Sequence, residues 1–218
     1  MNRALVTFAV GGFQLLLELA QPGLEEYADR HHYTLITDPP AVLERPPSWH
    51  KITALMAALD EYEEALWVDC DTVIVDPTLD VADEIPPEAW QAITLHHTHE
   101  GEVPSAGVWY ARQPLQPVLE AIWRHDEYLH HRWWEQAALQ HLLGYTPNQL
   151  PVHLDRPNRP TELYRRTHWL GLEWNTLALP GHDLELTGLR IVHAAPGNPI
   201  STRAQVMREL ITRAPANV

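Results

Sequence analysis

Two aspartates, Asp69 and Asp71, follow an apolar run in the segment WVDCDTVIVD (67–76), and they are the residues best suited to chemistry. If the strand predicted here reaches both, they face the same side, because side chains alternate along a strand. Cys70, between them, then faces the apolar side. Two carboxylates directed at one point suit Mg²⁺ or Mn²⁺, which leave coordination positions open for phosphate oxygens. The segment therefore predicts a metal site for a phosphorylated ligand.

An isolated Asp-x-Asp is more often a solvated strand end or a helix N-cap, so the surrounding sequence has to decide. The preceding segment, SWHKITALMAALDEY (48–62), carries Ile52, Leu55 and Leu59 at helical spacing. A helix therefore leads into a buried strand whose far end carries the two acids. In open α/β sheets, ligands bind at the carboxyl ends of strands, and this context favours a binding site.

Six segments, in this order, are similar to those of one enzyme family. They are 24–38, 48–77, PSAGVWYAR (104–112), WWEQAALQHLL (133–143), EWN (173–175) and IVHAAPGNP (191–199). With them the chain resembles nucleotide-sugar glycosyltransferases of the GT-A fold. The likeness is greatest to the galactosyl/mannosyltransferase group typified by yeast α-galactosyltransferases and plant xyloglucan xylosyltransferases. The resemblance implies an α/β, Rossmann-type nucleotide-diphospho-sugar transferase fold, with a central mixed, mostly parallel sheet flanked by helices.

The same resemblance implies an activity and its cofactors. A hexose or pentose would pass from a nucleoside-diphosphate sugar, a UDP-sugar in the first instance, to an unidentified glycan, small-molecule or protein acceptor with retention of configuration. Mn²⁺ or Mg²⁺ would be held by Asp69, Asp71 and His193. Glu135 and Gln136 would face the donor sugar and act in catalysis. Inversion with an acidic base is the alternative outcome.

The resemblance also places further residues around the donor. One position departs from the family pattern, since Ser105-Ala106-Gly107 stands where many relatives have Asn-x-Gly. Lys51 could equally be a surface lysine. Glu135 could be a helix-terminal acid, but the adjacent tryptophan pair favours a role in a pocket. His193 could be an ordinary buried histidine, but the small residues and turn formers after it favour a close approach to a ligand. The tryptophans expected beside the acceptor are Trp109, Trp133, Trp134 and Trp174. The expected donor-binding set is Thr7, Ala9, Lys51, Asp69, Cys70, Asp71, Ser105, Gly107, Trp174, Asn175 and Gly197.

Composition and charge narrow the choice of partners. The chain has 218 residues, 45% of them hydrophobic, which suits a single catalytic domain over 1–218. A net charge of −14 with scattered arginines argues against a nucleic-acid partner. The N-terminal segment shows neither a membrane span nor a signal-peptide pattern, and the single cysteine agrees with a reducing compartment. We therefore expect a cytoplasmic protein without an integral membrane segment.

Two other functional classes are also compatible with acids on an α/β sheet. A nucleotidyltransferase usually carries a glycine-rich basic loop after its first strand, but VGGFQLLL (10–17) has no lysine or arginine. A non-catalytic carbohydrate- or nucleotide-binding protein of the same fold would need the tryptophans but not the metal acids. His96, His97 and His99 could form a zinc site, although loop histidines without nearby cysteines more often face solvent.

Periodicity predicts the remaining elements. Strands are expected at 4–10, 33–38, 91–97, 108–112 and 189–194, with a loop over 98–106. Two helical stretches before residue 33 are expected to be interrupted at Gln21-Pro22-Gly23. Further helices are expected at 114–125, 132–143 and 201–213, the second of these closed by Gly144. The segment 145–167 is expected to be irregular.

Overall fold

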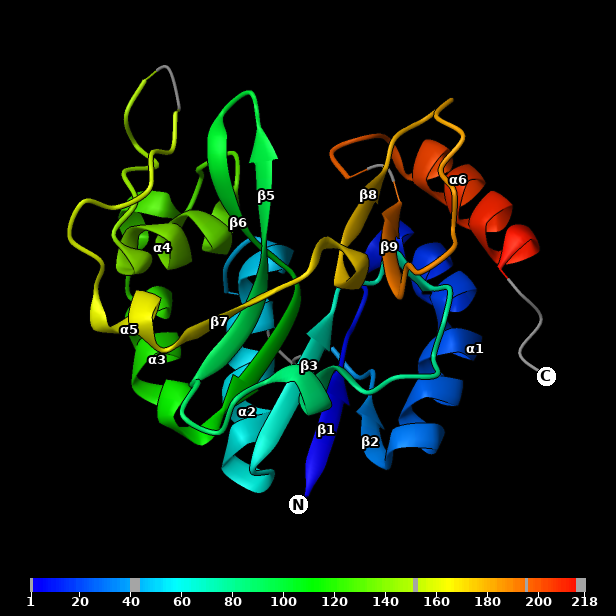
Figure 1. Ribbon diagram of the computed structural model, residues 1–218, viewed down its shortest axis with the longest axis horizontal. Helices are drawn as coiled ribbons and strands as arrows, with labels where there is room; N and C mark the ends of the chain where they lie inside the picture. Colours follow the sequence, from blue (N-terminus) through cyan, green and yellow to red (C-terminus); the bar gives the residue numbers. More distant parts are fainter. Residues whose placement is uncertain (1, 40–43, 151–152, 195, 215–218) are drawn as a thin grey trace.

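The computed structural model describes residues 2–39, 44–150, 153–194 and 196–214 (Figure 1). Its central sheet has the strand order β2-β1-β3-β6-β5-β7. β1 pairs in parallel with β2 and β3, and β5 with β7, whereas β6 runs antiparallel to β3 and β5. The expected mixed, mostly parallel α/β sheet is confirmed. The strands are β1 (Arg3–Val6), β2 (Tyr33–Ile36), β3 (Glu64–Val68), β5 (Gln91–Thr98), β6 (Gly101–Arg112) and β7 (Thr167–Leu170).

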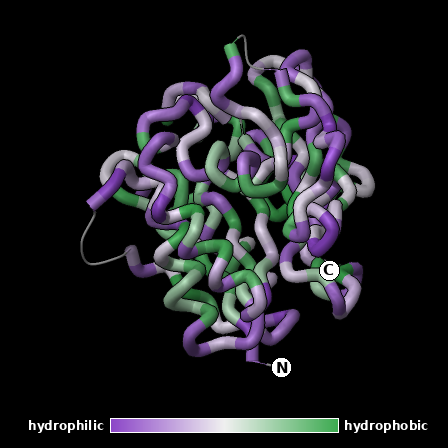
Figure 2. The backbone as a smooth tube through the Cα atoms, turned by 90° about the vertical axis from the view of Figure 1, so that its left-hand side faces the viewer, coloured by the Kyte–Doolittle hydropathy of each residue, from purple (hydrophilic) through white to green (hydrophobic). Residues whose placement is uncertain are grey.

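Helices cover both faces of this sheet, as Figure 1 shows. One face packs against α1 (Gln14–His31) and α6 (Ile200–Arg213), and the other against α2 (His50–Glu61), α3 (Gln116–Trp123) and α4 (Trp134–Leu143). Alternate residues of a strand serve opposite faces: Leu66 and Val68 join the α1 side, Ala65 and Trp67 the α2 side. The strands are therefore apolar on both sides, as sheets covered by two helix layers require. Figure 2 shows these hydrophobic stretches inside a more hydrophilic periphery.

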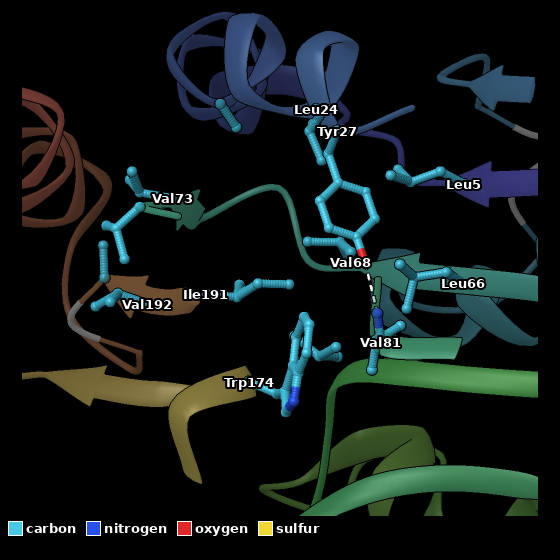
Figure 3. Packing of buried hydrophobic residues seen from close by; sticks show 14 of the residues in the cluster. Leu5, Leu24, Tyr27, Leu66, Val68, Val73, Val81, Trp174, Ile191 and Val192 are labelled. Carbon is cyan, nitrogen blue, oxygen red and sulfur yellow. Dashed lines mark hydrogen bonds between the residues drawn. The ribbon is translucent and has the colours of Figure 1, made fainter. Parts of the chain in front are cut away.

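A second sheet has the order β4-β9-β8 and lies beside α6. It consists of β4 (Thr72–Ile74), β8 (Thr176–Ala178) and β9 (Ile191–Ala194). Figure 3 shows Val73, Ile191 and Val192 of this sheet in the same apolar cluster as Leu5 and Leu66 of the central sheet. The two sheets therefore share one hydrophobic core.

Several elements differ from the sequence-based expectation. α1 is continuous through Pro22, whose ring lies on the exposed side while Leu16, Ala20 and Leu24 keep the buried stripe intact. β6 begins at Gly101, so most of the expected loop 98–106 is strand. β4 is a separate strand after Asp71, and β7 and β8 are short strands that were not expected. Within 145–167 the structure adds α5 (Glu162–Arg165).

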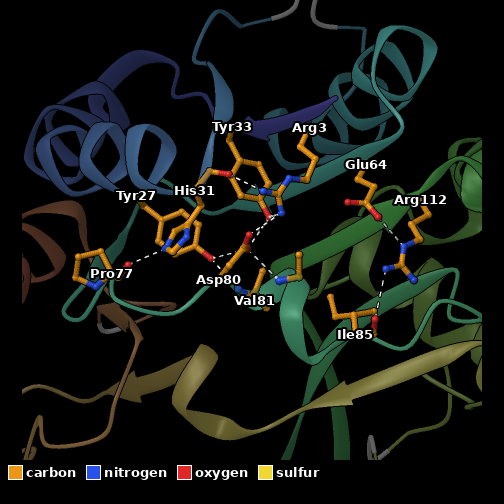
Figure 4. A network of polar contacts seen from close by, with 11 residues as sticks. Arg3, Tyr27, His31, Tyr33, Glu64, Pro77, Asp80, Val81, Ile85 and Arg112 are labelled. Atoms are coloured by element: carbon orange, nitrogen blue, oxygen red, sulfur yellow. Dashed lines mark hydrogen bonds and ion pairs between the residues drawn. The ribbon is translucent and has the colours of Figure 1, made fainter. Parts of the chain in front are cut away.

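A polar network fastens the segment after β4 to the far end of the sheet (Figure 4). Asp80 accepts hydrogen bonds from Arg3 (2.6 Å) and Tyr33 (2.8 Å), and Tyr27 receives one from the Val81 amide. Burial and the neighbouring Asp80 raise the pKa of the Tyr27 phenol, which stays protonated. This network is structural and lies at the amino-terminal end of β1, away from the acids that follow β3.

Among the described residues, no helix combines the length and apolar character needed to span a membrane.

Candidate active site

Asp69 and Asp71 lie in a tight turn between β3 and β4, and not on one strand as the spacing suggested. The turn is closed by the Thr72 amide and hydroxyl, which both donate to the Asp69 carbonyl (3.1 and 2.8 Å). Backbone bonds tie Asp69 to Gly107 on β6 and Asp71 to Ala194 on β9. The prediction of a shared strand face was wrong, but the turn still brings the two carboxylates together.

His193 on β9 completes a group of three candidate ligands. One ligand atom from each of Asp69, Asp71 and His193 lies within 4.8 Å of the others. His193 Nε2 lies 3.0 Å from Asp71 Oδ1, and both residues are buried. Burial opposes the charged form of each, but their mutual attraction raises the pKa of His193 and lowers that of Asp71. More than a hundred residues of sequence separate the two acids from the histidine that the resemblance assigned to them.

Arg203 on α6 also binds Asp71, and the sequence interpretation missed it. Its guanidinium donates to Asp71 Oδ2 at 2.5 Å. Arg203 precedes Met207 by four residues and Leu210 by seven, which places a charge on the buried face of the helix. A charged residue in an apolar stripe usually requires a partner, and this was the signal that could have found it.

Lys51 is buried and paired with two acids, so it is not a surface lysine. Its ammonium lies 2.9 Å from Asp69 Oδ1 and 3.2 Å from Glu135 Oε1, and it donates to the Ala106 carbonyl at 2.9 Å. Burial alone would lower the pKa of Lys51, but Asp69 and Glu135 raise it above its usual value. Burial raises the pKa of Glu135, while Lys51 works against this. Lys51 thus links the first aspartate of the turn to the acid at the start of α4.

The residues at 105–107 of β6 are held from several sides. The Ala106 amide donates to Gln136 Oε1 at 3.0 Å, while Asn175 donates to the Ser105 hydroxyl at 3.0 Å. A side chain at Gly107 would place its Cβ 2.8 Å from His193 Nδ1, so only glycine fits. Ser105 and Gly107 therefore form one wall of the site.

Several buried polar atoms in and around this region lack a partner among the described residues. They are Thr7 Oγ1, Glu135 Oε2, Gln140 Oε1, Asn175 Oδ1 and His193 Nδ1. Unsatisfied buried polar atoms are uncommon in folded proteins, and a bound polar ligand would supply partners for those of Glu135, Asn175 and His193, which lie beside the two aspartates.

The remaining expected residues are placed as follows. Thr7 and Ala9 are buried just beyond the carboxyl end of β1. Gly197 is exposed with φ +80°, a backbone conformation that favours glycine. Cys70 is half-buried, and burial beside Asp71 raises the pKa of its thiol.

Trp174 lies in the core, with its indole nitrogen bonded to Glu84 at 2.9 Å, and Trp109 is also fully buried. Neither can line an acceptor site. Trp133 is half-buried, and Trp134 is 40% exposed with φ +49°, directly before Glu135.

The three histidines of the β5–β6 hairpin do not form a metal site in the part of the chain that the structure describes. His97 and His99 are exposed, and among the described residues only Asp69, Asp71 and His193 form a group close enough to share an ion. His96 is buried. Burial, with smaller contributions from His193 and His97, lowers the pKa of His96 to about 4.

The chemistry of the three ligand side chains suits the cation expected from the sequence. Carboxylates and an imidazole are ligands that Mn²⁺ accepts. Asp69 Oδ2 has no partner among the described residues, while Oδ1 is fixed by Lys51 and by the Trp67 indole (2.6 Å). The three side chains therefore fit a divalent cation.

The sequence model of the galactosyl transferase GMA12/MNN10 family matches residues 19–113, a little under half of the chain. The match contains Lys51, both turn aspartates and Gly107, whereas Glu135, His193 and Arg203 lie beyond it. A search of curated proteins finds no match.

Solved structures with the same fold are glycosyltransferases. One is a glycosyltransferase involved in glycosylation of the major capsid of PBCV-1, 14% identical, with a TM-score of 0.71 over 96% of this chain and all of that one. The galactosyltransferase LgtC, in complex with donor and acceptor sugar analogs, is 10% identical, with a TM-score of 0.58 over 99% of this chain and 97% of that one. GlyE of Streptococcus pneumoniae TIGR4 is 13% identical, with a TM-score of 0.60 over 100% of this chain and 67% of that one.

These likenesses confirm the GT-A fold expected from the sequence. Together with the family match, they support the assignment of the chain as a glycosyltransferase, the enzyme class predicted above.

Proposed function

We propose that the chain transfers a hexose or pentose from a UDP-sugar, or another nucleoside-diphosphate sugar, to a glycan, small-molecule or protein acceptor in a reaction that requires Mn²⁺. The observation that carries this proposal is the convergence of Asp69, Asp71 and His193 on one point. A divalent cation held there would neutralise the negative charge that develops on the departing diphosphate.

The chain's own residues have distinct roles in this proposal. Lys51 fixes Asp69 through Oδ1 and leaves Oδ2 for the cation. Gln136 is half-buried, and its Oε1 accepts from the Ala106 amide, so its amide nitrogen remains for a hydroxyl of the donor sugar. Glu135 is buried beside Lys51, and its second oxygen accepts no hydrogen bond from the residues that the structure describes. A negative group at this place would stabilise the positive charge that the sugar acquires as its bond to the diphosphate breaks.

We also propose that the transfer retains the configuration of the donor sugar, as in the group that the sequence resembles. Thr7, Ala9 and Gly197 would contact the nucleotide, and Ser105, Gly107 and Asn175 the donor sugar. Ser105 and Asn175 support this placement because they are buried and hydrogen-bonded to each other beside His193.

The test is binding and turnover with and without a divalent cation. UDP and GDP are titrated calorimetrically in Mn²⁺ and in EDTA, and hydrolysis of UDP- and GDP-sugars is followed under both conditions. We expect nucleotide binding only with Mn²⁺. Asp71→Asn should lower the affinity for UDP in Mn²⁺ by more than the roughly 10- to 100-fold seen when a residue that only supports a metal ligand is removed.

Asp76→Asn is the matched control, because Asp76 lies beyond the other end of β4 and pairs with Arg190. Equal binding of UDP in Mn²⁺ and EDTA, or an Asp71→Asn variant that behaves like Asp76→Asn, would contradict the metal role. The anomeric configuration of the first product, read by NMR, tests retention.

A further inference from the structure

Arg203 places a permanent positive charge directly beside the proposed metal ligands. Its side chain is 16% exposed, and one of its nitrogens lies 2.5 Å from Asp71 Oδ2. Its Nε donates to the Asn198 carbonyl at 2.7 Å, which fixes the plane of the guanidinium. The other terminal nitrogen has no hydrogen-bond partner among the described residues. Arg203 is therefore held in place and still offers donors.

For cation binding alone, this arrangement is unfavourable. The guanidinium competes with a divalent cation for Asp71 and repels the cation electrostatically. Lys51 already neutralises the charge of Asp69. A positive charge that weakens metal binding is expected to serve another purpose in the site. The planar guanidinium of an arginine can donate two parallel hydrogen bonds to two oxygens of a phosphate.

Arg203 also lies against the segment that follows β1. The guanidinium carbon lies 5.4 Å from the centre of the Phe13 ring. Phe13 ends a short 3-10 helix (Gly11–Phe13) that follows β1, and a side chain at Gly12 would approach Ile200 of α6 to 3.0 Å. Arg203 therefore contacts both the metal carboxylate and the loop at the carboxyl end of β1. In open α/β sheets a nucleotide binds at such an end.

We propose that Arg203 binds the diphosphate of the donor directly and, while no nucleotide is bound, serves as the counter-ion of Asp71. This inference rests on the proposed function. When a diphosphate is bound, its oxygens accept hydrogen bonds from Arg203 in place of Asp71. The Asp71 carboxylate is then free to bind the metal, so nucleotide and metal increase each other's affinity. By linkage, each ligand then increases the affinity for the other by the same factor. One guanidinium thus couples the two binding steps.

The experiment separates the two roles because they change affinity in opposite directions. Binding of Mn²⁺ without nucleotide is measured from the EPR signal of the free ion, and binding of UDP at saturating Mn²⁺ is measured by calorimetry. We expect Arg203→Gln to bind Mn²⁺ alone about tenfold more tightly and UDP at least about tenfold more weakly, because a charge-assisted bond is lost. Arg203→Lys keeps the charge without the fork, so it should keep wild-type Mn²⁺ affinity and lose part of the UDP affinity.

Arg208→Gln, on the exposed side of the same helix, is the control and should match wild type in both titrations. Weaker binding of both Mn²⁺ and UDP in Arg203→Gln would show that Arg203 only orients Asp71, and would overturn the inference. Unchanged UDP affinity in both Arg203 variants would also overturn it. If the wild type itself does not bind UDP in Mn²⁺, the proposed function is wrong. If the wild type binds UDP and the Arg203 variants bind it equally well, only the inference about Arg203 is wrong. Should Arg203→Gln not fold, Arg203→Lys decides.

Discussion

Gly107 on β6 faces the imidazole of His193 on β9 so closely that a Cβ would lie 2.8 Å from Nδ1. The same Cβ would approach the Asn175 amide nitrogen to 3.2 Å. The glycine therefore lets two strands from different sheets meet at the proposed metal site.

Gly107→Ala is expected to displace the His193 ring and to weaken Mn²⁺ binding by about tenfold or more, in the range known for disturbed metal surroundings. Calorimetric or EPR titration of Mn²⁺ measures the effect. Gly23→Ala in α1 is the matched control, since its Cβ would meet Ile74 at an ordinary 3.6 Å and alanine favours a helix. Wild-type Mn²⁺ affinity in Gly107→Ala would show that the strands move apart without disturbing the ligand.

The sequence predicted much of the fold and only part of the site. Long periodic elements such as α2 and α6 were found because their apolar stripes extend over several turns. The ligand group depended on a resemblance, since no local pattern links His193 to residues more than a hundred positions earlier. Arg203 was missed because its partner, Asp71, belongs to another element. Trp174 was assigned to the site although its indole bonds to Glu84 in the core, because sequence does not show toward which side an aromatic residue turns.

Lys51→Met is expected to destabilise the fold, because buried Glu135 and half-buried Asp69 are then left without their counter-charge. Removal of one partner of a buried pair costs about 3–5 kcal/mol of the free energy of unfolding. Chemical denaturation measures it. Adding Glu135→Gln to Lys51→Met should restore a large part of the loss, because it removes one of the two unpaired charges. A double variant no more stable than Lys51→Met would show that Lys51 stabilises the fold through packing alone.

Glu135→Gln keeps the size of the side chain and removes its charge, so it tests the catalytic role. We expect kcat for donor hydrolysis to fall by roughly a hundredfold, the size of effect seen when one electrostatic contact to a transition state is removed. UDP affinity in Mn²⁺ should stay near wild type, because an interaction made only in the transition state does not contribute to ground-state binding.

Glu64→Gln provides the comparison for Glu135→Gln, because Glu64 is equally buried and also pairs with a cation, Arg112 (Figure 4). Glu64 lies at the start of β3, the end of the strand away from the two aspartates. If both variants keep full turnover, Glu135 has no part in transfer and serves only to pair with Lys51.

His96 is expected to make stability depend on pH. Its pKa is lowered to about 4 by burial, whereas an unfolded histidine titrates near 6.5. Between these values the unfolded chain binds the proton and the folded chain does not, so stability falls as pH decreases from about 6.5 to about 4. His96→Gln should flatten this part of the profile, measured by urea denaturation at a series of pH values. His99→Gln, exposed in the turn that follows the strand, should leave it unchanged, and a profile equally steep in His96→Gln would assign the proton to another group.

The turn that carries Asp69 and Asp71 joins β3 of the central sheet to β4 of the small sheet. The three proposed metal ligands therefore do not belong to one rigid layer, and the angle between the two sheets sets the distance from Asp69 to His193. That angle depends on apolar contacts such as those of Val73 and Val192 in the shared core. Substitutions at these positions, whose side chains lie in the core, would then alter the size of the proposed cation site. Metal preference could thus change during evolution while every ligand residue stays the same.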